Sequence, residues 1–304
     1  MHIRALEWVD RFQRHLTTER RVSPHTISNY GRDIAALVAY CDRERLEHWT
    51  DVLVPQVRAF AARSHAGGLS PQSVQRRLSA VRTFMKFLVR EGVTGGNYAE
   101  VIQAPKTARR LPSVLDVDQV IRLIEIPGND AYAVRDRAIM ELFYSSALRL
   151  QELVSLNRGD IDFPEGVVRV TGKGNIARIV PVGSFALKAV QRWLRVRSQV
   201  AKDGEQAVFV GRGGRRLGAR AVQTRVAHWA RQQGLAMHVH PHMFRHACAT
   251  HVLESSGSIR EVQELLGHAS ISTTQIYTHL NAQHLLEVYM KAHPRAQRVK
   301  DSNE

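Results

Sequence analysis

A stretch without helical or strand periodicity divides the chain into two parts. Residues 95–116 read GGNYAEVIQAPKTARRLPSVLD, in which glycines and prolines flank a basic cluster. Such residues favour turns and linkers over regular elements. With 304 residues, of which 44% are hydrophobic, the chain is long enough for a domain with its own core on each side. We therefore expect one domain over residues 1–94, a linker over 95–116 and a larger domain over 117–304.

The first domain carries start signals for long helices. Ser23 and Ser70 each precede a proline, and a capping hydroxyl followed by proline suits the first turn of a helix. After Ser70 the apolar residues recur at helical spacing, and most basic residues fall outside this stripe. The stripe consists of Val74, Leu78, Val81, Met85 and Leu88. The pattern predicts an all-helical domain with a packed face and a basic face. The basic face is either a solvated surface or one that meets a polyanion.

The second domain combines helices with a small sheet. Residues 117–124 and 130–147 have apolar side chains at helical spacing. In GVVRVTGKGNIARIVPVG, residues 166–183, the period changes to two, which predicts a β-hairpin with a glycine-containing turn. Helices return from Ser184, and AVFVG at 207–211 is a candidate strand. The expected fold is mainly α with a small antiparallel β-sheet.

The charge of the chain indicates what kind of partner it binds, and its cysteine content indicates the cellular compartment. A formal charge of +15 at pH 7 and a pI near 10.5 favour a polyanionic partner, first nucleic acid and second an acidic membrane surface. Only Cys41 and Cys248 are present, without disulfide or zinc spacing, which suits a reducing cytoplasm. The N-terminal MHIRALEWVDRF contains acidic residues and does not resemble a signal peptide, and no apolar window has membrane-spanning length. We expect a cytoplasmic protein.

Four segments hold residues suited to acid–base or phosphate chemistry. They are YSSALRLQEL, TGKGN, HPHMFRHACATH and LLGHASISTTQIYTHL. Each residue alone has a structural explanation, such as an ion pair, a turn lysine, a helix cap or a half-buried aromatic ring. Their order along the chain is more informative than any one of them. The candidates are Arg149 with Glu152, Lys173, His242 with Arg245, His268 and Tyr277.

The joint pattern resembles the catalytic signature of the tyrosine recombinase (phage integrase) family, and particularly its Xer subfamily. That signature is Arg, Lys, His-x-x-Arg, His or Trp, then Tyr, and every member has a match here in the same order. The resemblance spans essentially the whole chain. It implies a helical, SAM-like core-binding domain and a mixed α/β catalytic domain that form a C-shaped clamp on DNA. It also implies a tail, over about residues 281–304, that docks into a neighbouring subunit.

The resemblance implies DNA cleavage and rejoining through a 3′-phosphotyrosyl intermediate, with Tyr277 as the nucleophile. Arg149 and Arg245 would stabilise the charge that develops on the phosphate oxygens. His242, neutral near pH 7, is the expected base for the phenol, and Lys173 the expected acid for the leaving 5′-oxygen.

The remaining implied roles concern support and partners. His268 would donate a hydrogen bond to the phosphate, and Glu152 would orient an arginine or the catalytic histidine. One phosphoester replaces another, so no cofactor, metal or ATP is expected. The implied substrate is double-stranded DNA with a dif-like site. The implied partners are a XerD-like recombinase in a heterotetramer and an FtsK-like translocase as regulator, in the resolution of chromosome dimers during cell division.

The sequence departs from the family pattern at two places, and several alternative functions stay open. Ala147 stands where the family usually has glycine, and Met243 and Phe244 stand where it often has Lys-Leu, although neither departure removes a reacting group. The same residues would serve a type IB topoisomerase or a mobile-element integrase, or would persist in a DNA-binding protein that has lost catalysis. A zinc protein is a further alternative, with histidines as ligands. Those histidines are His238, His240, His242, His246 and His251.

Overall fold

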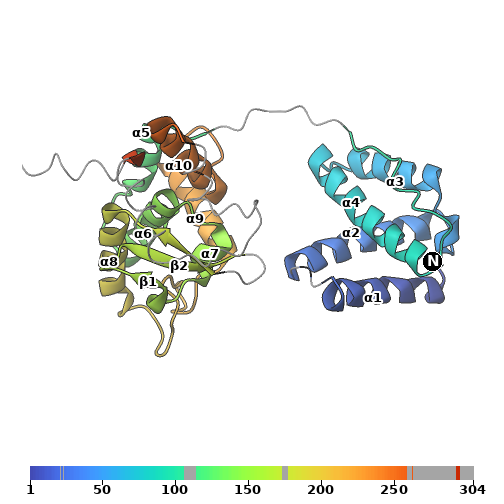
Figure 1. Ribbon diagram of the computed structural model, residues 1–304, viewed down its shortest axis with the longest axis horizontal. Helices are drawn as coiled ribbons and strands as arrows, with labels where there is room; N and C mark the ends of the chain where they lie inside the picture. The colour runs from blue at the N-terminus through green and yellow to red at the C-terminus, as the bar shows by residue number, and fades with distance from the viewer. Residues whose placement is uncertain are drawn as a thin grey trace, which may run out of the picture. The chain divides into compact units, whose positions relative to one another are not determined.

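The computed structural model describes residues 1–20, 22, 24–105, 114–172, 177–258, 262 and 292–294. The chain forms two compact units, Met1–Leu111 and Pro112–Glu304, each with its own hydrophobic core (Figure 1). The division falls inside the stretch that lacks periodicity. Within the described ranges, every helix is too short or too polar to cross a membrane.

The described part of the first unit is helical, as predicted. Its helix α4 begins after Ser70, whose hydroxyl accepts a hydrogen bond from the Ser73 backbone N–H at 3.2 Å. The elements are α1 (Ile3–Thr18), α2 (Pro24–Arg43), η1 (Trp49–Asp51), α3 (Val54–Ala66) and α4 (Pro71–Arg90). The capping prediction at Ser70 is confirmed, while Ser23 lies outside the described residues.

The predicted apolar stripe of α4 lies in the core of this unit. All five of its residues are buried. Phe84 of the same helix contacts the rings of Phe12 and Trp49, with centroids 5.1 and 4.8 Å away. Outside the apolar stripe, Arg76 and Arg77 form ion pairs with the buried Asp33 of α2. Part of the predicted basic face therefore holds two helices together.

Residues predicted as the start of the linker pack against α4. Ala99 and Ile102 are buried in the core of the first unit. Arg82 donates hydrogen bonds to the backbone oxygens of both residues. Residues 106–113 lie outside the described part of the chain, so the linker boundaries stay a prediction.

The second unit is mainly helical with a three-stranded antiparallel sheet, which confirms the expected fold class. In the predicted hairpin, β2 pairs with β3 from Val167↔Pro181 to Thr171↔Ala177, and β1 pairs with the other edge of β2. The elements are α5 (Val117–Ile124), α6 (Ala131–Ser146), α7 (Leu150–Ser155), η2 (Arg158–Asp160), β1 (Ile161–Asp162), β2 (Val167–Thr171), β3 (Ala177–Pro181), α8 (Ser184–Arg197), α9 (Ala219–Gln232) and α10 (Pro241–Ser256).

The prediction of a strand at 207–211 is wrong. This segment forms only isolated bridges, although its apolar residues are buried. Side chains of α8 bind two of its carbonyl groups: Arg197 Nε donates to the Ala207 oxygen at 2.9 Å, and Trp193 Nε1 to the Val208 oxygen at 2.8 Å. The Val208 N–H donates to the Leu156 oxygen, and the Phe209 oxygen accepts from the Leu217 N–H, both at 2.9 Å. The backbone bonds of this buried apolar run are thus divided among side chains and separate segments, and no continuous ladder forms.

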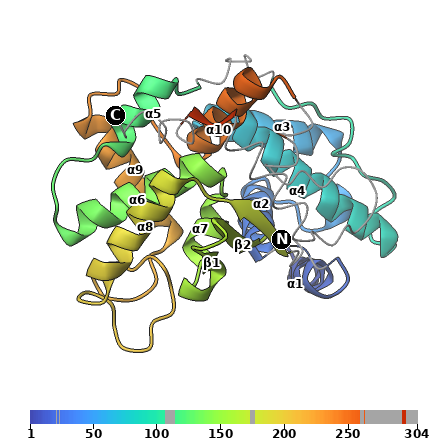
Figure 2. The same cartoon turned by 60° about the vertical axis from the view of Figure 1, so that its left-hand side comes forward.

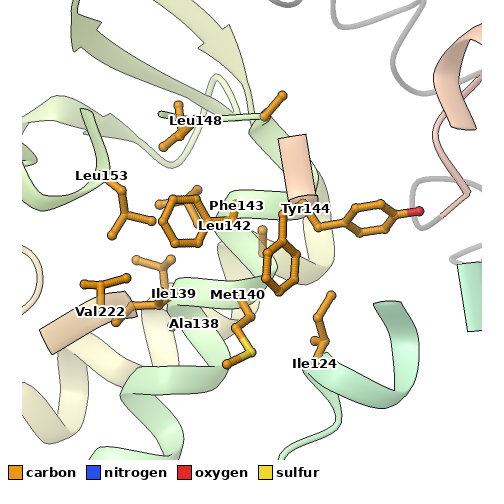
Figure 3. Close-up of a cluster of buried hydrophobic side chains, with 14 of the residues drawn as sticks. Ile124, Ala138, Ile139, Met140, Leu142, Phe143, Tyr144, Leu148, Leu153 and Val222 are labelled. Carbon is orange, nitrogen blue, oxygen red and sulfur yellow. The ribbon is translucent and has the colours of Figure 1, made fainter. Parts of the chain in front are cut away.

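Helix α6 lies at the centre of the second unit, in contact with α5, α8, α9 and α10 (Figure 2). Its side chains are buried almost throughout. Apolar residues of α6 meet Leu153 of α7 and Val222 of α9 (Figure 3). The positions of the helices that contact α6 are therefore set by their packing against it.

Ala147, directly after α6, has a left-handed backbone with φ 48° and ψ 33°. This conformation reverses the chain between α6 and α7, and glycine adopts it with least strain. This left-handed conformation explains why the tyrosine recombinase family usually has glycine at this position. The methyl group of Ala147 is fully buried.

Two residues near the C-terminus pack on the second unit itself. Ala292 and His293 are buried, and the His293 ring lies 4.6 Å from the ring of Tyr144 in α6. They belong to the segment predicted to dock into a neighbouring subunit. The rest of that segment lies outside the described residues.

Candidate active site

Arg149 lies at the junction that follows Ala147 and is the N-cap residue of α7. The Glu152 carboxylate accepts a hydrogen bond from the Arg149 backbone N–H at 2.9 Å and a second from Arg149 Nη1, also at 2.9 Å. An acidic side chain in the first turn satisfies a backbone N–H that a helix otherwise leaves unpaired. The side chain of Arg149 is 40% exposed.

A third charged residue, Arg178 of β3, completes this cluster. Arg178 Nη1 donates to Glu152 Oε1 at 2.6 Å, and Arg178 Nη2 to Glu152 Oε2 at 2.9 Å. The sequence reasoning did not select Arg178. One signal was available: strand alternation places it on the same buried face as Val180, and a charged residue at an inward position requires a partner.

Burial raises the pKa of Glu152, but the hydrogen bonds from Arg178 and Arg149 outweigh it and hold that pKa below its ordinary value of 4.5. The carboxylate is therefore ionised at neutral pH.

Arg245, on α10, reaches the same junction from another direction. Its Nη1 donates a hydrogen bond to the backbone oxygen of Ala147, two residues before Arg149. Burial, with the charges of Arg149 and Arg178, lowers the pKa of Arg245 to about 10. Arg245 therefore remains charged at neutral pH beside two other guanidinium groups.

His242 lies one turn before Arg245 on α10. Desolvation, together with the neighbouring His246, Arg245 and Arg149, lowers the pKa of His242 below its ordinary value of 6.5. The ring is consequently neutral at pH 7 and able to accept a proton. Its surroundings favour that form because each of these neighbours is positive or can become positive.

The cluster has an excess of positive charge. The guanidinium groups of Arg149 and Arg178 contact the carboxylate of Glu152, and Arg245 is near enough for all three of these groups to influence its pKa. Guanidinium groups bind phosphate oxygens through paired N–H donors. The junction of α6 with α7 is thus suited to a phosphate group with a neutral histidine nearby. Lys173, His268 and Tyr277 lie outside the described residues, and their places in this site stay predictions.

The histidines that suggested zinc do not gather around one point. The rings of His238 and His240 lie 6.4 Å apart, and those of His240 and His242 6.3 Å apart. His251 is buried and its Nδ1 is 2.9 Å from the Tyr144 hydroxyl. In the part of the chain that the structure describes, no group of three or more His, Cys, Asp or Glu residues is arranged to hold a metal ion.

Comparison with known proteins identifies the class. Residues 113–284 match the model of the phage integrase family, and residues 9–92 match the N-terminal SAM-like domain of phage integrases. The solved structure of XerH recombinase bound to a palindromic difH substrate has the same fold, with a TM-score of 0.69, 21% identity, and coverage of 93% of this chain and 84% of that one. The chain belongs to the phage integrase family, whose members cleave and rejoin DNA strands with a tyrosine nucleophile.

Curated relatives narrow the likeness within that family. The tyrosine recombinase XerC of Alcanivorax borkumensis is 49% identical over 303 residues, which cover 99% of this chain and 98% of the relative. XerC of Xanthomonas campestris pv. campestris (strain B100) is 48% identical over 296 residues, covering 97% of this chain and 91% of the relative. Within the Xer subfamily the motifs above most resemble those of XerC, and these relatives confirm that prediction. The activity is that of a XerC-like site-specific tyrosine recombinase.

Proposed function

We propose that the chain exchanges DNA strands at a dif-like site through a covalent bond between Tyr277 and a 3′-phosphate. The tyrosine oxygen bonds to phosphorus as the bond from phosphorus to the 5′-oxygen breaks. One phosphoester replaces another, so the reaction needs no ATP. The phenol, with an ordinary pKa of about 10, passes its proton to His242. The 5′-oxygen takes a proton from Lys173 and leaves as a hydroxyl.

The arrangement of Arg149 and Arg245 at one helix junction carries this proposal. The transition state gains negative charge on the non-bridging phosphate oxygens, and preorganised guanidinium donors stabilise that charge. Arg245 contacts the turn at Ala147, while Glu152 holds Arg149 two residues further on. We assign His268 as an additional hydrogen-bond donor to the phosphate. Side chains supply each of these functions, and we propose that no metal or cofactor takes part.

The biological setting follows from the XerC-like sequence. We propose that the chain assembles with a XerD-like recombinase as a heterotetramer on two dif-like sites, and that its C-terminal tail joins neighbouring subunits. An FtsK-like translocase would control the reaction, which resolves chromosome dimers in the cytoplasm during cell division. The charge of +15 supports extensive phosphate contact, so DNA affinity should fall steeply as salt rises.

The test is a nicked duplex carrying a dif-like site, incubated with the chain in the presence and absence of a XerD-like recombinase. The wild-type chain should form a covalent adduct with the fragment that ends in the 3′-phosphate at the cleavage site. Tyr277→Phe should bind the duplex as the wild type does and form no adduct. Tyr132→Phe, which removes a hydroxyl at the start of α6, is the matched control and should react at the wild-type rate.

Two results would change this assignment. Adducts that persist in Tyr277→Phe would exclude Tyr277 as the nucleophile. Relaxation of supercoiled DNA that lacks any dif-like site would instead favour a type IB topoisomerase.

A further inference from the structure

Arg178 is a buried arginine whose two terminal nitrogens both contact one residue. Its side chain is 9% exposed, and Nη1 and Nη2 each donate to a different oxygen of Glu152. The third nitrogen, Nε, is buried and has no hydrogen-bond partner among the described residues. Burial of a guanidinium is unfavourable without a counter-charge, and in the described structure Glu152 supplies it.

The acceptor sites of Glu152 are thereby filled. Each carboxylate oxygen accepts one hydrogen bond from Arg178 and one from Arg149, the latter through Nη1 or the backbone N–H. A carboxylate has about four lone-pair positions, so its orientation is set by these four donors together. Removing Arg178 would release half of them and free the carboxylate to rotate at the start of α7.

The two arginines differ in what else they can reach. Arg178 is buried, whereas Arg149 keeps 40% of its side chain exposed. Both arginines contact Glu152, so the three groups together keep one net positive charge, on the side where Arg149 is exposed to a phosphate. Without Arg178, Arg149 and Glu152 would remain as a pair whose charges offset each other.

We infer that Arg178 is a positioning residue for strand cleavage. It supplies a positive charge to Glu152 and connects β3 to the start of α7. Arg149 therefore meets the scissile phosphate in a fixed orientation, and the site keeps a net positive charge. The inference rests on the phosphate-binding role proposed above for Arg149. In the sequence, β3, the strand that carries Arg178, follows the proposed acid Lys173 by a few residues.

Protonation of Glu152 provides a specific signature. Burial by itself raises the pKa of this carboxyl, and Arg178 is the strongest group that lowers it. Loss of Arg178 therefore leaves only the hydrogen bonds from Arg149 to oppose the effect of burial, and it moves the pKa of Glu152 upward. Once protonated, Glu152 no longer accepts every bond from Arg149, so cleavage by the variant should decline at a higher pH than cleavage by the wild type.

The experiment measures single-turnover formation of the covalent adduct on the nicked dif-like duplex, between pH 5 and 9. It compares the wild type with Arg178→Met and Arg178→Lys in the full chain. Arg135→Met is the matched control, since Arg135 is also buried and paired with a buried carboxylate, that of Asp136, outside the site. Duplex affinity and thermal unfolding are measured for each variant.

We expect Arg178→Met to cleave about 100-fold more slowly at pH 7, the loss typical of a misplaced reacting group. Its acid limb should move to higher pH while its duplex affinity changes by less than about threefold, because the phosphate contacts elsewhere persist. Arg178→Lys keeps the charge but not the paired donors and should be intermediate. Arg135→Met should lose stability and retain the wild-type pH profile of its folded fraction.

A cleavage rate for Arg178→Met within about threefold of the wild type would overturn the inference. So would an unshifted pH profile, or a loss that matches the Arg135→Met control. If Arg178→Met does not fold, Arg178→Lys decides: a wild-type rate and profile in that variant overturns the inference. Absence of adducts with the wild-type chain would instead refute the proposed function itself, which keeps the two failures apart.

Discussion

Replacing Glu152 by glutamine should destabilise the second unit by about 3 to 5 kcal/mol, the usual cost of removing one partner from a buried ion pair. Glutamine has nearly the same shape, but one of its two polar ends is an NH₂ group. That group would face N–H donors of Arg149 and Arg178 that now meet an oxygen. Two hydrogen bonds to a charged group, worth about 1.5 to 3 kcal/mol each, are lost together. The buried guanidinium of Arg178 also loses its counter-charge.

The assay is differential scanning calorimetry of the full chain at pH 7. For a unit of this size 1 kcal/mol corresponds to about 2 to 4 °C, so the transition of residues 112–304 should fall by about 6 to 20 °C. The transition of residues 1–111 should stay in place. Glu165→Gln, at an exposed position after β1, is the matched control and should change stability by less than about 0.5 kcal/mol.

The difference between wild type and Glu152→Gln should also depend on pH. The pKa of Glu152 lies below its ordinary value in the folded chain, so its contribution is complete above about pH 4.5 and is lost as the pH falls through the folded pKa. The two proteins should therefore converge in acid. A decrease of less than about 2 °C at pH 7 would refute the reasoning, because it would mean that solvent already screens these contacts.

Three further outcomes are expected. Ala147→Val should lower the free energy of unfolding by more than about 2 kcal/mol, because a branched side chain would enter a left-handed, fully buried position. Ala147→Gly should change it by less than about 1 kcal/mol. Relief of backbone strain in the folded chain should offset the lost methyl contacts and the greater freedom of the unfolded chain. Urea unfolding measures both. Tyr144→Phe should cost about 1 to 3 kcal/mol in the same assay, because the buried His251 ring loses its 2.9 Å partner; an unchanged midpoint would count against that bond. Adduct formation should be constant above pH 7 and decline below pH 6.5, where His242 becomes protonated; a rate that rises in acid would exclude it as the base.

The turn at Ala147 is the place where two arginines distant in sequence, Arg149 and Arg245, come together. Arg245 lies 98 positions after Ala147, yet it donates to the carbonyl of that residue. The left-handed backbone directs this carbonyl towards α10, and α7 begins two residues later with Arg149 as its N-cap residue. Stability of the turn and placement of both arginines are therefore linked, which makes Ala147 a position where a change in folding should also change cleavage.

Much of the fold could be predicted because the relevant forces act locally. A capping hydroxyl at Ser70 and an apolar side chain every three or four residues after it determine where α4 begins and which face it buries. Alternation of period two likewise predicts the pairing of β2 with β3. The strand predicted at 207–211 is wrong because two of its carbonyl groups bind side chains of α8 and its other backbone groups bond to separate segments. No pattern within five residues reveals these partners.

The sequence by itself determined the residue types available to the site and their order along the chain. Those residue types predict the chemistry, because guanidinium groups can stabilise a phosphate, a neutral histidine can accept a proton and a tyrosine can act as a nucleophile. Tertiary structure alone decided which charges meet: Arg178 with Glu152 across 26 positions, and Arg245 with the turn before Arg149. A buried charge must find an opposite charge or a carbonyl wherever the packing of helices and strands brings one within reach. That choice depends on how α6, α7, β3 and α10 pack together, and such packing is not encoded in any short segment.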